Sequence, residues 1–175
     1  MTRGLRNCNP LNIRRVAGTK WKGQSASQTD RRFVQFREVE WGLRAAFCIL
    51  RTYARRYDAV CIRDIVRRWA PPSENDTEQY IRNVCLWTGL GGMQRLTERE
   101  WPQLIRAMAR QECGALLSEH TVMRGFCLYK LLYPLKKEKM KKMNLIELAT
   151  KVLVAALTAF LTALTTTSCM GCGPF

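Results

Sequence analysis

The pattern that most limits the fold is a series of amphipathic segments, most of them followed by a residue that stops a helix. In residues 39–57, apolar side chains such as Leu43 and Phe47 recur at helical spacing, with arginines on the other faces. Pro71 and Gly89 end later segments, because neither residue type continues a helix well. We therefore predict a mainly α-helical protein, with helices over residues 39–57, 62–69, 77–88, 98–111 and 121–132.

Local signals indicate where two of these helices begin. Asp76, or Asn75 before it, can accept a hydrogen bond from the first backbone N–H groups of the following helix. Thr97 and Glu100 have the spacing of a capping box, which places a helix start near residue 98. Pro102 favours a start a few residues later, because proline is best tolerated in the first turn.

Residues 3–36 lack helical periodicity and predict an irregular region. The stretch 3–15, RGLRNCNPLNIRR, is rich in Asn and contains Pro, and both set turns. Apolar and polar residues partly alternate in 32–36, which favours a short strand. A small β-hairpin with residues near Trp21 is one arrangement that this pattern allows.

Charge and cysteine content narrow the class of partner. The net charge is +15, so we expect an anionic partner: cell-wall polymer, a membrane surface or nucleic acid. No groove-reading motif, zinc finger or RNA-binding signature is present, which argues against nucleic acid. The eight cysteines and the one histidine, His120, lack zinc-ligand spacing, so we predict no metal and no cofactor. Four of the cysteines lie among apolar residues, where a free cysteine behaves as a small buried hydrophobe: Cys48, Cys61, Cys85 and Cys127. We therefore expect a domain made with reduced thiols, such as one from a bacterial cytoplasm, and no signal peptide at the start of the chain.

One carboxyl has the setting that a glycosidase needs. Glu112 ends a segment whose apolar face includes Leu104 and Met108, and Gly114 is a natural helix stop. Apolar neighbours can raise the pKa of such a carboxyl, so that it stays protonated near neutral pH. By itself the position better fits a solvated glutamate in the last turn of a surface helix, because Glu is mostly a surface residue.

The character of the chain changes after residue 135. Residues 136–143 form a basic linker, and residues 144–175 form a predicted hydrophobic helical tail. We predict membrane association through residues 144–165, although the charge-free part, 152–164, spans only roughly 20 Å as a helix. The competing interpretation is that the tail packs onto the domain of residues 1–135. The tail resembles the smalltalk family of small bacterial proteins over residues 140–175, a resemblance that implies no chemistry.

Several motifs together resemble the structural protein P5-like family of phage and prophage proteins, over residues 3–117. They are RGLRNCNPLNIR, Trp21-x-Gly23, WGLRA at 41–45, RWAPPSENDT at 68–77 and the pair Tyr80-Ile81. The resemblance implies a lysozyme-type virion protein. Two residues depart from the family pattern: Cys8 stands in place of Asn and Leu11 in place of Gly. If that glycine has a positive φ angle, Leu11 strains or shifts the loop.

A second resemblance concerns the order of motifs. In lytic transglycosylases a helix ending in Glu-Ser-Gly comes first, and a Thr-Arg-Asn-Tyr-Val-like segment comes late. Here the Asn-Pro loop is first, TEQYI at 77–81 is in the middle, and RQECG at 110–114 is last. This looks like the same set in rotated order, and permutation is permissible where the termini lie close together. The resemblance implies a circularly permuted lysozyme-like domain with Glu112 as acid/base and Tyr80 beside it.

Further residues have a candidate role in this site. Polar and aromatic side chains could bind sugar rings, although buried turns and cores use the same residues, as we expect for Trp41 and Trp69. A transglycosylase needs no second carboxylate, because a hydroxyl of the substrate closes on the anomeric carbon, whereas a muramidase would usually need one. The candidates for substrate binding are Asn7, Asn9, Asn12, Trp21 and Asn75, and those for a second carboxylate are Glu40 and Glu74.

These observations predict a peptidoglycan-degrading glycosidase of phage or prophage origin, of the lytic transglycosylase or muramidase type. It would be found in the bacterial cytoplasm or the phage virion and act on the cell wall. Two alternatives are a non-enzymatic virion structural protein with the same fold, in contact with other virion proteins, and a basic nucleic-acid-binding phage protein.

Overall fold

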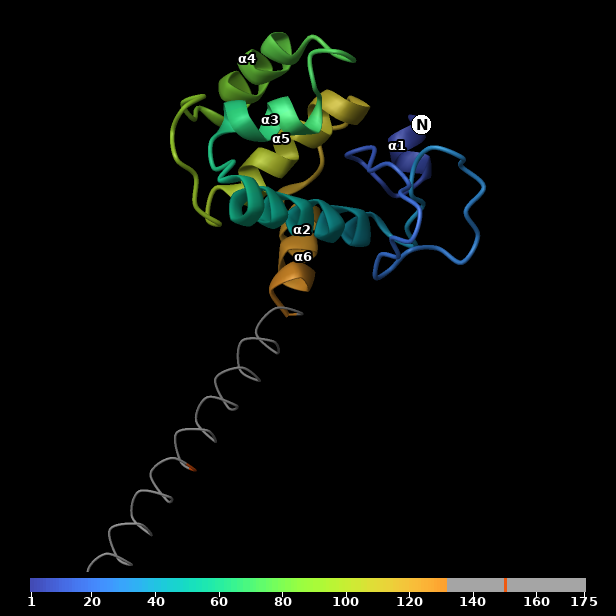
Figure 1. Ribbon diagram of the computed structural model, residues 1–175. Coiled ribbons are helices and arrows are strands. Elements are labelled where there is room, and N and C mark those ends of the chain that lie inside the picture. Colours follow the sequence, from blue (N-terminus) through green and yellow to red (C-terminus); the bar gives the residue numbers. More distant parts are fainter. Residues whose placement is uncertain (132–149, 151–175) are drawn as a thin grey trace, which may run out of the picture. The chain divides into compact units, whose positions relative to one another are not determined.

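The computed structural model describes residues 1–131 and residue 150. Six helices and no strand occur in this part of the chain, which confirms the mainly α-helical class (Figure 1). The helices are α1 (Arg3–Arg6), α2 (Val39–Tyr57), α3 (Ile62–Trp69), α4 (Thr77–Thr88), α5 (Trp101–Cys113) and α6 (Glu119–Leu131).

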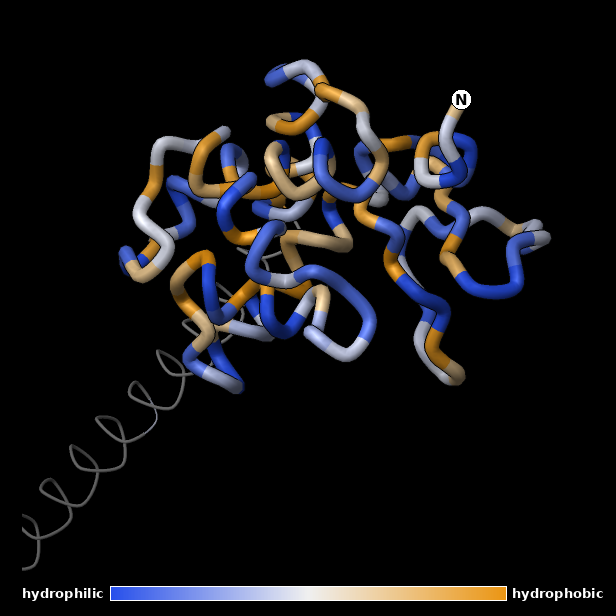
Figure 2. Tube along the Cα trace, turned by 90° about the horizontal axis from the view of Figure 1, so that it is seen from above, coloured by the Kyte–Doolittle hydropathy of each residue, from blue (hydrophilic) through white to orange (hydrophobic). Residues whose placement is uncertain are grey.

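Helix α5 is the centre of the packing. It contacts α1, α2, α4 and α6, and its buried face includes Leu104, Ile105 and Met108, as the apolar spacing predicts. Helix α2 also packs along α6, where the ring centroid of Phe47 lies 5.0 Å from that of Phe126. Figure 2 shows apolar and hydrophilic stretches following one another along the chain, and apolar residues of α2 and α5 such as Leu43 and Leu104 are buried.

The helix ends follow the local signals in most places. Helices α2, α3 and α4 have the predicted bounds, and the Asp76 side chain accepts a 2.9 Å hydrogen bond from the Gln79 N–H. The predicted bounds of the last two helices were inexact. Helix α5 begins at Trp101 instead of residue 98, because Thr97 and Glu100 bond to each other in a separate turn and Pro102 occupies the first helical turn.

The N-terminal region differs from the prediction in detail. Residues 3–6 form the short helix α1, and residues 32–36 form no strand. Two isolated antiparallel bridges, Arg14 with Phe33 and Gln24 with Phe36, take the place of the expected hairpin. Several backbone groups here, among them the carbonyls of Val34 and Gln35, bond to side chains instead of to a neighbouring strand.

The structure shows the backbone conformation at the two positions that depart from the family pattern, Cys8 and Leu11. Leu11 is buried and has no positive φ, so the strain considered for it does not arise. Cys8 instead has φ 49°, a left-handed conformation that Asn tolerates better than Cys. Asn12 adopts the same region with φ 49°.

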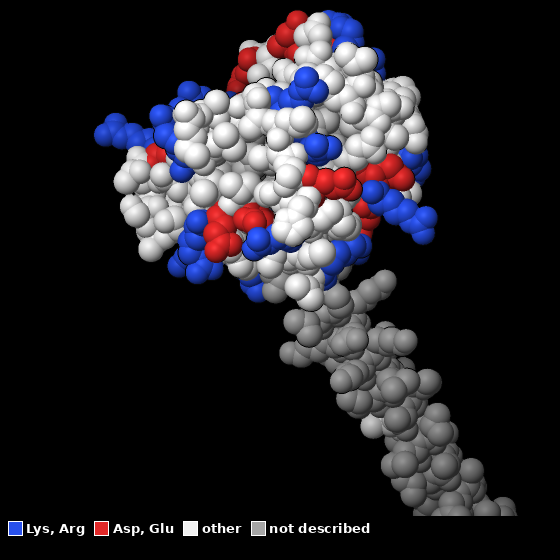
Figure 3. All heavy atoms as spheres, turned by 180° about the vertical axis from the view of Figure 1, so that it is seen from behind, with Lys and Arg blue, Asp and Glu red and all other residues white. Residues whose placement is uncertain are grey.

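Charged side chains are spread over the surface. Figure 3 shows Lys and Arg scattered among acidic and uncharged residues on one face of the domain. Several arginines are ion-paired, as Arg63 and Arg67 are with Glu78. The six cysteines of residues 1–131 are free thiols, although Cys127 is exposed and does not share the buried setting expected of it.

The predicted linker, 136–143, and the predicted tail, 144–175, lie outside the described residues, apart from residue 150. In the part of the chain that the structure describes, no helix is both long enough and apolar enough to span a bilayer.

Candidate active site

Glu112 lies in the last turn of α5, where Gly114 ends the helix with φ 68°. Met108 and Leu104, about one and two turns before Glu112 on the same side of the helix, are fully buried and fix α5 in the core. The apolar pattern and the glycine stop thus set both the position and the direction of the glutamate side chain. It faces three other segments of the chain.

Three uncharged donors bind the Glu112 carboxyl. The Nδ2 of Asn12 donates to Oε2 at 3.1 Å, and the Nε1 of Trp69 and the Oη of Tyr80 donate to Oε1 at 3.1 and 3.2 Å. The Asn12 amide also donates to the backbone carbonyl of Glu112 at 3.1 Å. Glu112 makes no ion pair with any residue of the described domain. The carboxyl is therefore held in place without a neighbouring cation in direct contact.

This environment favours the protonated acid. Burial raises the pKa of the Glu112 carboxyl above its ordinary value, and the hydrogen bonds from Asn12, Tyr80 and Trp69 and the charge of Arg14 only partly oppose that effect. Burial and the neighbouring Glu112 charge raise the pKa of Tyr80 well above its ordinary value. Tyr80 is thus a neutral hydrogen-bond donor over the physiological range.

Glu112 opens into a cleft with a volume of about 480 Å³. One wall comes from the N-terminal region and includes Asn12, Arg14, Trp21 and Phe33. The other comes from α2, α3 and the turn before α4, and includes Ile49, Tyr53, Trp69 and Asn75. The Tyr53 and Trp69 rings meet edge to face with centroids 6.4 Å apart. Aromatic and amide groups in such a cleft can contact the faces and hydroxyls of a sugar chain.

The structure brings together five of the residues singled out from the sequence. Glu112, Asn12, Trp21 and Asn75 line the cleft, and Tyr80 bonds to Glu112 from below the surface.

Asn7 and Asn9 are not in this cleft. Asn9 is fully buried, and its side chain donates to the carbonyls of Ile13 and Val34 at 2.9 and 2.8 Å. Asn7 donates to Asp30 at 2.7 Å. Both amides shape the loop that presents Asn12, because a buried amide must be satisfied by nearby backbone or side-chain groups.

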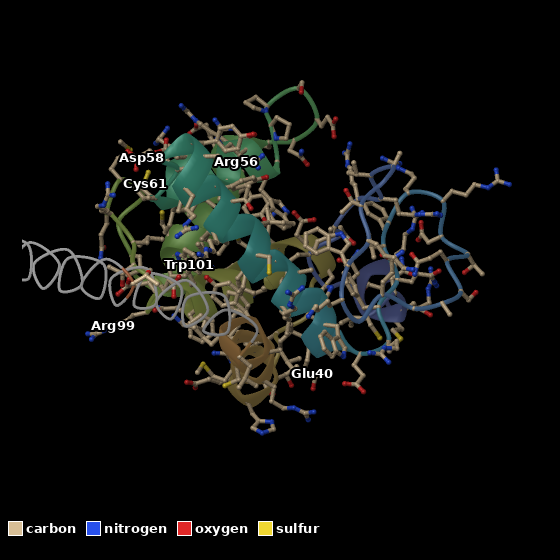
Figure 4. The ribbon with its side chains drawn as sticks, turned by 60° about the horizontal axis from the view of Figure 1, so that its bottom comes forward. Glu40, Arg56, Asp58, Cys61, Arg99 and Trp101 are labelled. Carbon is tan, nitrogen blue, oxygen red and sulfur yellow. The ribbon has the colours of Figure 1, made fainter. Side chains whose placement is uncertain are left out.

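Neither candidate for a second carboxylate lines the cleft. Glu40 lies at the N-terminal end of α2 (Figure 4) and forms a 3.4 Å ion pair with Arg124 of α6. Glu74 is ion-paired with Arg14 at the edge of the cleft. Within residues 1–131, the cleft therefore contains one carboxyl, that of Glu112.

Two contributors were not identified from the sequence. Trp69 is predicted to lie in the core, yet its indole N–H donates a hydrogen bond to Glu112. Its position as the last residue of α3, two residues before Pro71, is the sequence feature that indicates the end of a helix there. No sequence pattern indicates Arg14, which lies in the irregular stretch 3–15. Trp41 is a packing residue, since Gly23 (φ 74°) lies so close that an added Cβ would fall 2.1 Å from its ring.

The fold and the site define a small helical domain with a single buried carboxyl in an open cleft. No protein-family model matches the chain. The chain is 44% identical over 115 residues to Protein P5 of Pseudoalteromonas phage PM2, and the match covers 65% of this chain and 72% of the phage protein. The chain belongs to the protein P5 family.

Proposed function

We propose that this chain is a peptidoglycan-cleaving enzyme of phage origin, a lytic transglycosylase on a circularly permuted lysozyme-like domain. The observation that carries the proposal is the Glu112 carboxyl, which is held by three neutral donors in an open cleft and has a raised pKa. General acids of glycosidases require this combination of access and protonation.

In the proposed reaction, protonated Glu112 donates its proton to the glycosidic oxygen as the bond to the anomeric carbon breaks. The resulting carboxylate then removes the proton of a hydroxyl on the sugar that carries this anomeric carbon. The oxygen of that hydroxyl forms a bond to the anomeric carbon. The acid is regenerated, no water is consumed, and the product carries an anhydro ring. Asn12, Trp69 and Tyr80 stabilise the ionised carboxyl between the two steps.

The single carboxyl favours this route over hydrolysis. A retaining or inverting hydrolase places two carboxyls about 5 to 9.5 Å apart across the bond that is cut. Glu40 and Glu74 are both engaged by arginines, and neither lines the cleft. A muramidase would need one of them to reach the substrate.

The test is cleavage of isolated sacculi by the purified full-length chain and its Glu112→Gln variant. We expect the variant to lose at least 100-fold in rate, the usual scale for removing a general acid, while keeping its fold. Glu40→Gln is the matched control and should retain activity, since its carboxyl pairs with Arg124 outside the cleft. Mass spectrometry separates anhydro products of a transglycosylase from the reducing ends of a muramidase.

A non-enzymatic role is the second candidate, because the Glu112 carboxyl ties three segments together. Its hydrogen bonds join the N-terminal loop, α3 and α4 to α5. In a purely structural protein of the virion, the wild type would release no soluble muropeptides and Glu112→Gln would mainly lower the melting temperature. Both proposals place the chain in a phage particle or its bacterial host.

A further inference from the structure

Arg14 is the only positively charged side chain among the described residues that line the cleft. Its guanidinium makes two hydrogen bonds to the Glu74 carboxyl, from Nη1 to Oε1 at 3.5 Å and from Nη2 to Oε2. The pair connects the N-terminal wall of the cleft to the turn between α3 and α4.

This ion pair is open to solvent and can exchange partners. The side chains of Arg14 and Glu74 are 56% and 46% exposed. Exposed ion pairs of this kind add little to stability. The fold is therefore little disturbed when the carboxylate of a ligand displaces the Glu74 side chain from Arg14. The planar guanidinium fork matches a carboxylate in two-point contact, and such charge-assisted bonds give both affinity and orientation.

We infer that Arg14 forms a carboxylate-binding subsite of the cleft, which recognises an anionic group on the glycan substrate in place of Glu74. The inference rests on the proposed function and specifies its substrate class. Peptidoglycan supplies carboxylates from two sources: the lactyl group of sugars without a peptide, and the stem peptide. Asn75 and Trp21, in the same cleft, are placed to contact uncharged parts of the strand.

Glu74 has a defined part in this subsite. In the free protein it neutralises Arg14, which also bears electrostatically on Glu112 and opposes the rise of its pKa. A substrate carboxylate that replaces Glu74 keeps that balance of charge. Removal of the Glu74 charge is therefore expected to free Arg14 and to strengthen binding of anionic strands.

The test measures binding, so that it does not depend on turnover. The full-length Glu112→Gln protein is titrated calorimetrically with three ligands: peptidoglycan fragments with intact stem peptides, glycan strands stripped of peptides, and neutral chitooligosaccharides. The same titrations are repeated with proteins that carry a second substitution besides Glu112→Gln, which is Arg14→Gln, Arg14→Lys, Glu74→Gln or Arg15→Gln. Arg15 is the matched control, because it is the neighbouring arginine, bonds to the Asp30 carbonyl and does not line the cleft.

We expect Arg14→Gln to weaken binding of carboxylate-bearing ligands about ten- to hundredfold and to leave chitooligosaccharide binding unchanged. Arg14→Lys should recover part of the loss, Glu74→Gln should tighten binding, and Arg15→Gln should have no effect. An effect on stripped strands assigns the lactyl carboxylate, and an effect on peptide-bearing fragments alone assigns the stem peptide.

An equal loss for charged and neutral ligands, no loss for either, or no binding of any strand would overturn the subsite. Failure of the proposed function is a separate result, since it is read from cleavage of sacculi by the wild type. A protein that binds anionic strands through Arg14 without cleaving them would retain the subsite and lose the enzymatic proposal.

Discussion

At the scale of single residues, two features of the surroundings of Glu112 shift the pKa of its carboxyl in opposite directions. Its burial favours a protonated acid, whereas its three donors favour the carboxylate. Burial is the larger effect, so the pKa is raised. An acid that must give up and then recover a proton needs both forms to be accessible near the working pH.

This balance predicts how stability depends on pH. A raised pKa means that the folded protein binds more protons at Glu112 than the unfolded chain does, so the contribution of this group is complete below the unfolded pKa and is lost as pH rises through the folded pKa. A glutamine does not titrate. We expect the free energy of unfolding of the wild type, relative to Glu112→Gln, to fall as pH rises from the ordinary pKa of a glutamate through the raised pKa of Glu112 in the folded protein.

Chemical denaturation of both proteins across this range checks the sign. A difference that stays constant would show that the hydrogen bonds cancel the effect of burial on the pKa of Glu112, and one that grows in favour of the wild type as pH rises would show that they outweigh it.

At the scale of elements, the cleft depends on how closely α2 approaches the N-terminal loop. Gly42 in the first turns of α2 faces the carbonyl oxygen of Cys8, and an added Cβ would lie 2.3 Å from that oxygen. Only a residue without a side chain permits this contact. The same loop carries Asn12 to Glu112, so the packing of one helix turn positions one wall of the cleft.

We therefore expect Gly42→Ala to lower the free energy of unfolding by roughly 1–3 kcal/mol, the usual range for overpacking, despite the better helix propensity of alanine. Gly91→Ala is the matched control, because the atom nearest to its added Cβ lies at an ordinary 3.5 Å. Equilibrium urea denaturation compares the two. Equal effects of both changes would mean that the loop moves away from α2 without loss.

At the scale of the whole molecule, the chain joins a compact unit of residues 1–131 to a tail of different composition. The net charge of +15 is distributed over the chain, which suits approach to anionic cell-wall or lipid surfaces. An enzyme of the proposed kind would meet both surfaces at the bacterial envelope.

The tail gives the prediction at this scale. We expect the full chain to fractionate with membranes and a chain truncated to residues 1–135 to stay soluble and to unfold cooperatively. The apolar run would enter the bilayer, and each lysine before it adds about 1 kcal/mol near anionic headgroups. These lysines are Lys136, Lys137, Lys139, Lys141 and Lys142.

The test is to express both chains and to measure how much of each is found in the membrane and soluble fractions. Solubility of both chains, or unfolding of the truncated one, would assign the tail to the domain instead of the membrane.

The sequence by itself determined the helical class and the bounds of three of the six helices among the described residues. The bounds of α2, α3 and α4 could be read directly, because helical periodicity, a capping aspartate and glycine or proline stops act over a few residues. The same local logic indicated a carboxyl at the end of α5. These features do not depend on distant parts of the chain.

Only the tertiary structure decided which residues form the candidate site. Asn9 and Asn12 belong to one loop and have the same side chain, yet Asn9 bonds to Val34, 25 positions away, while Asn12 bonds to Glu112, 100 positions away. Trp69 and Arg14 join the cleft through contacts of the same long range. Such contacts depend on how the helices pack, and local periodicity carries no information about them.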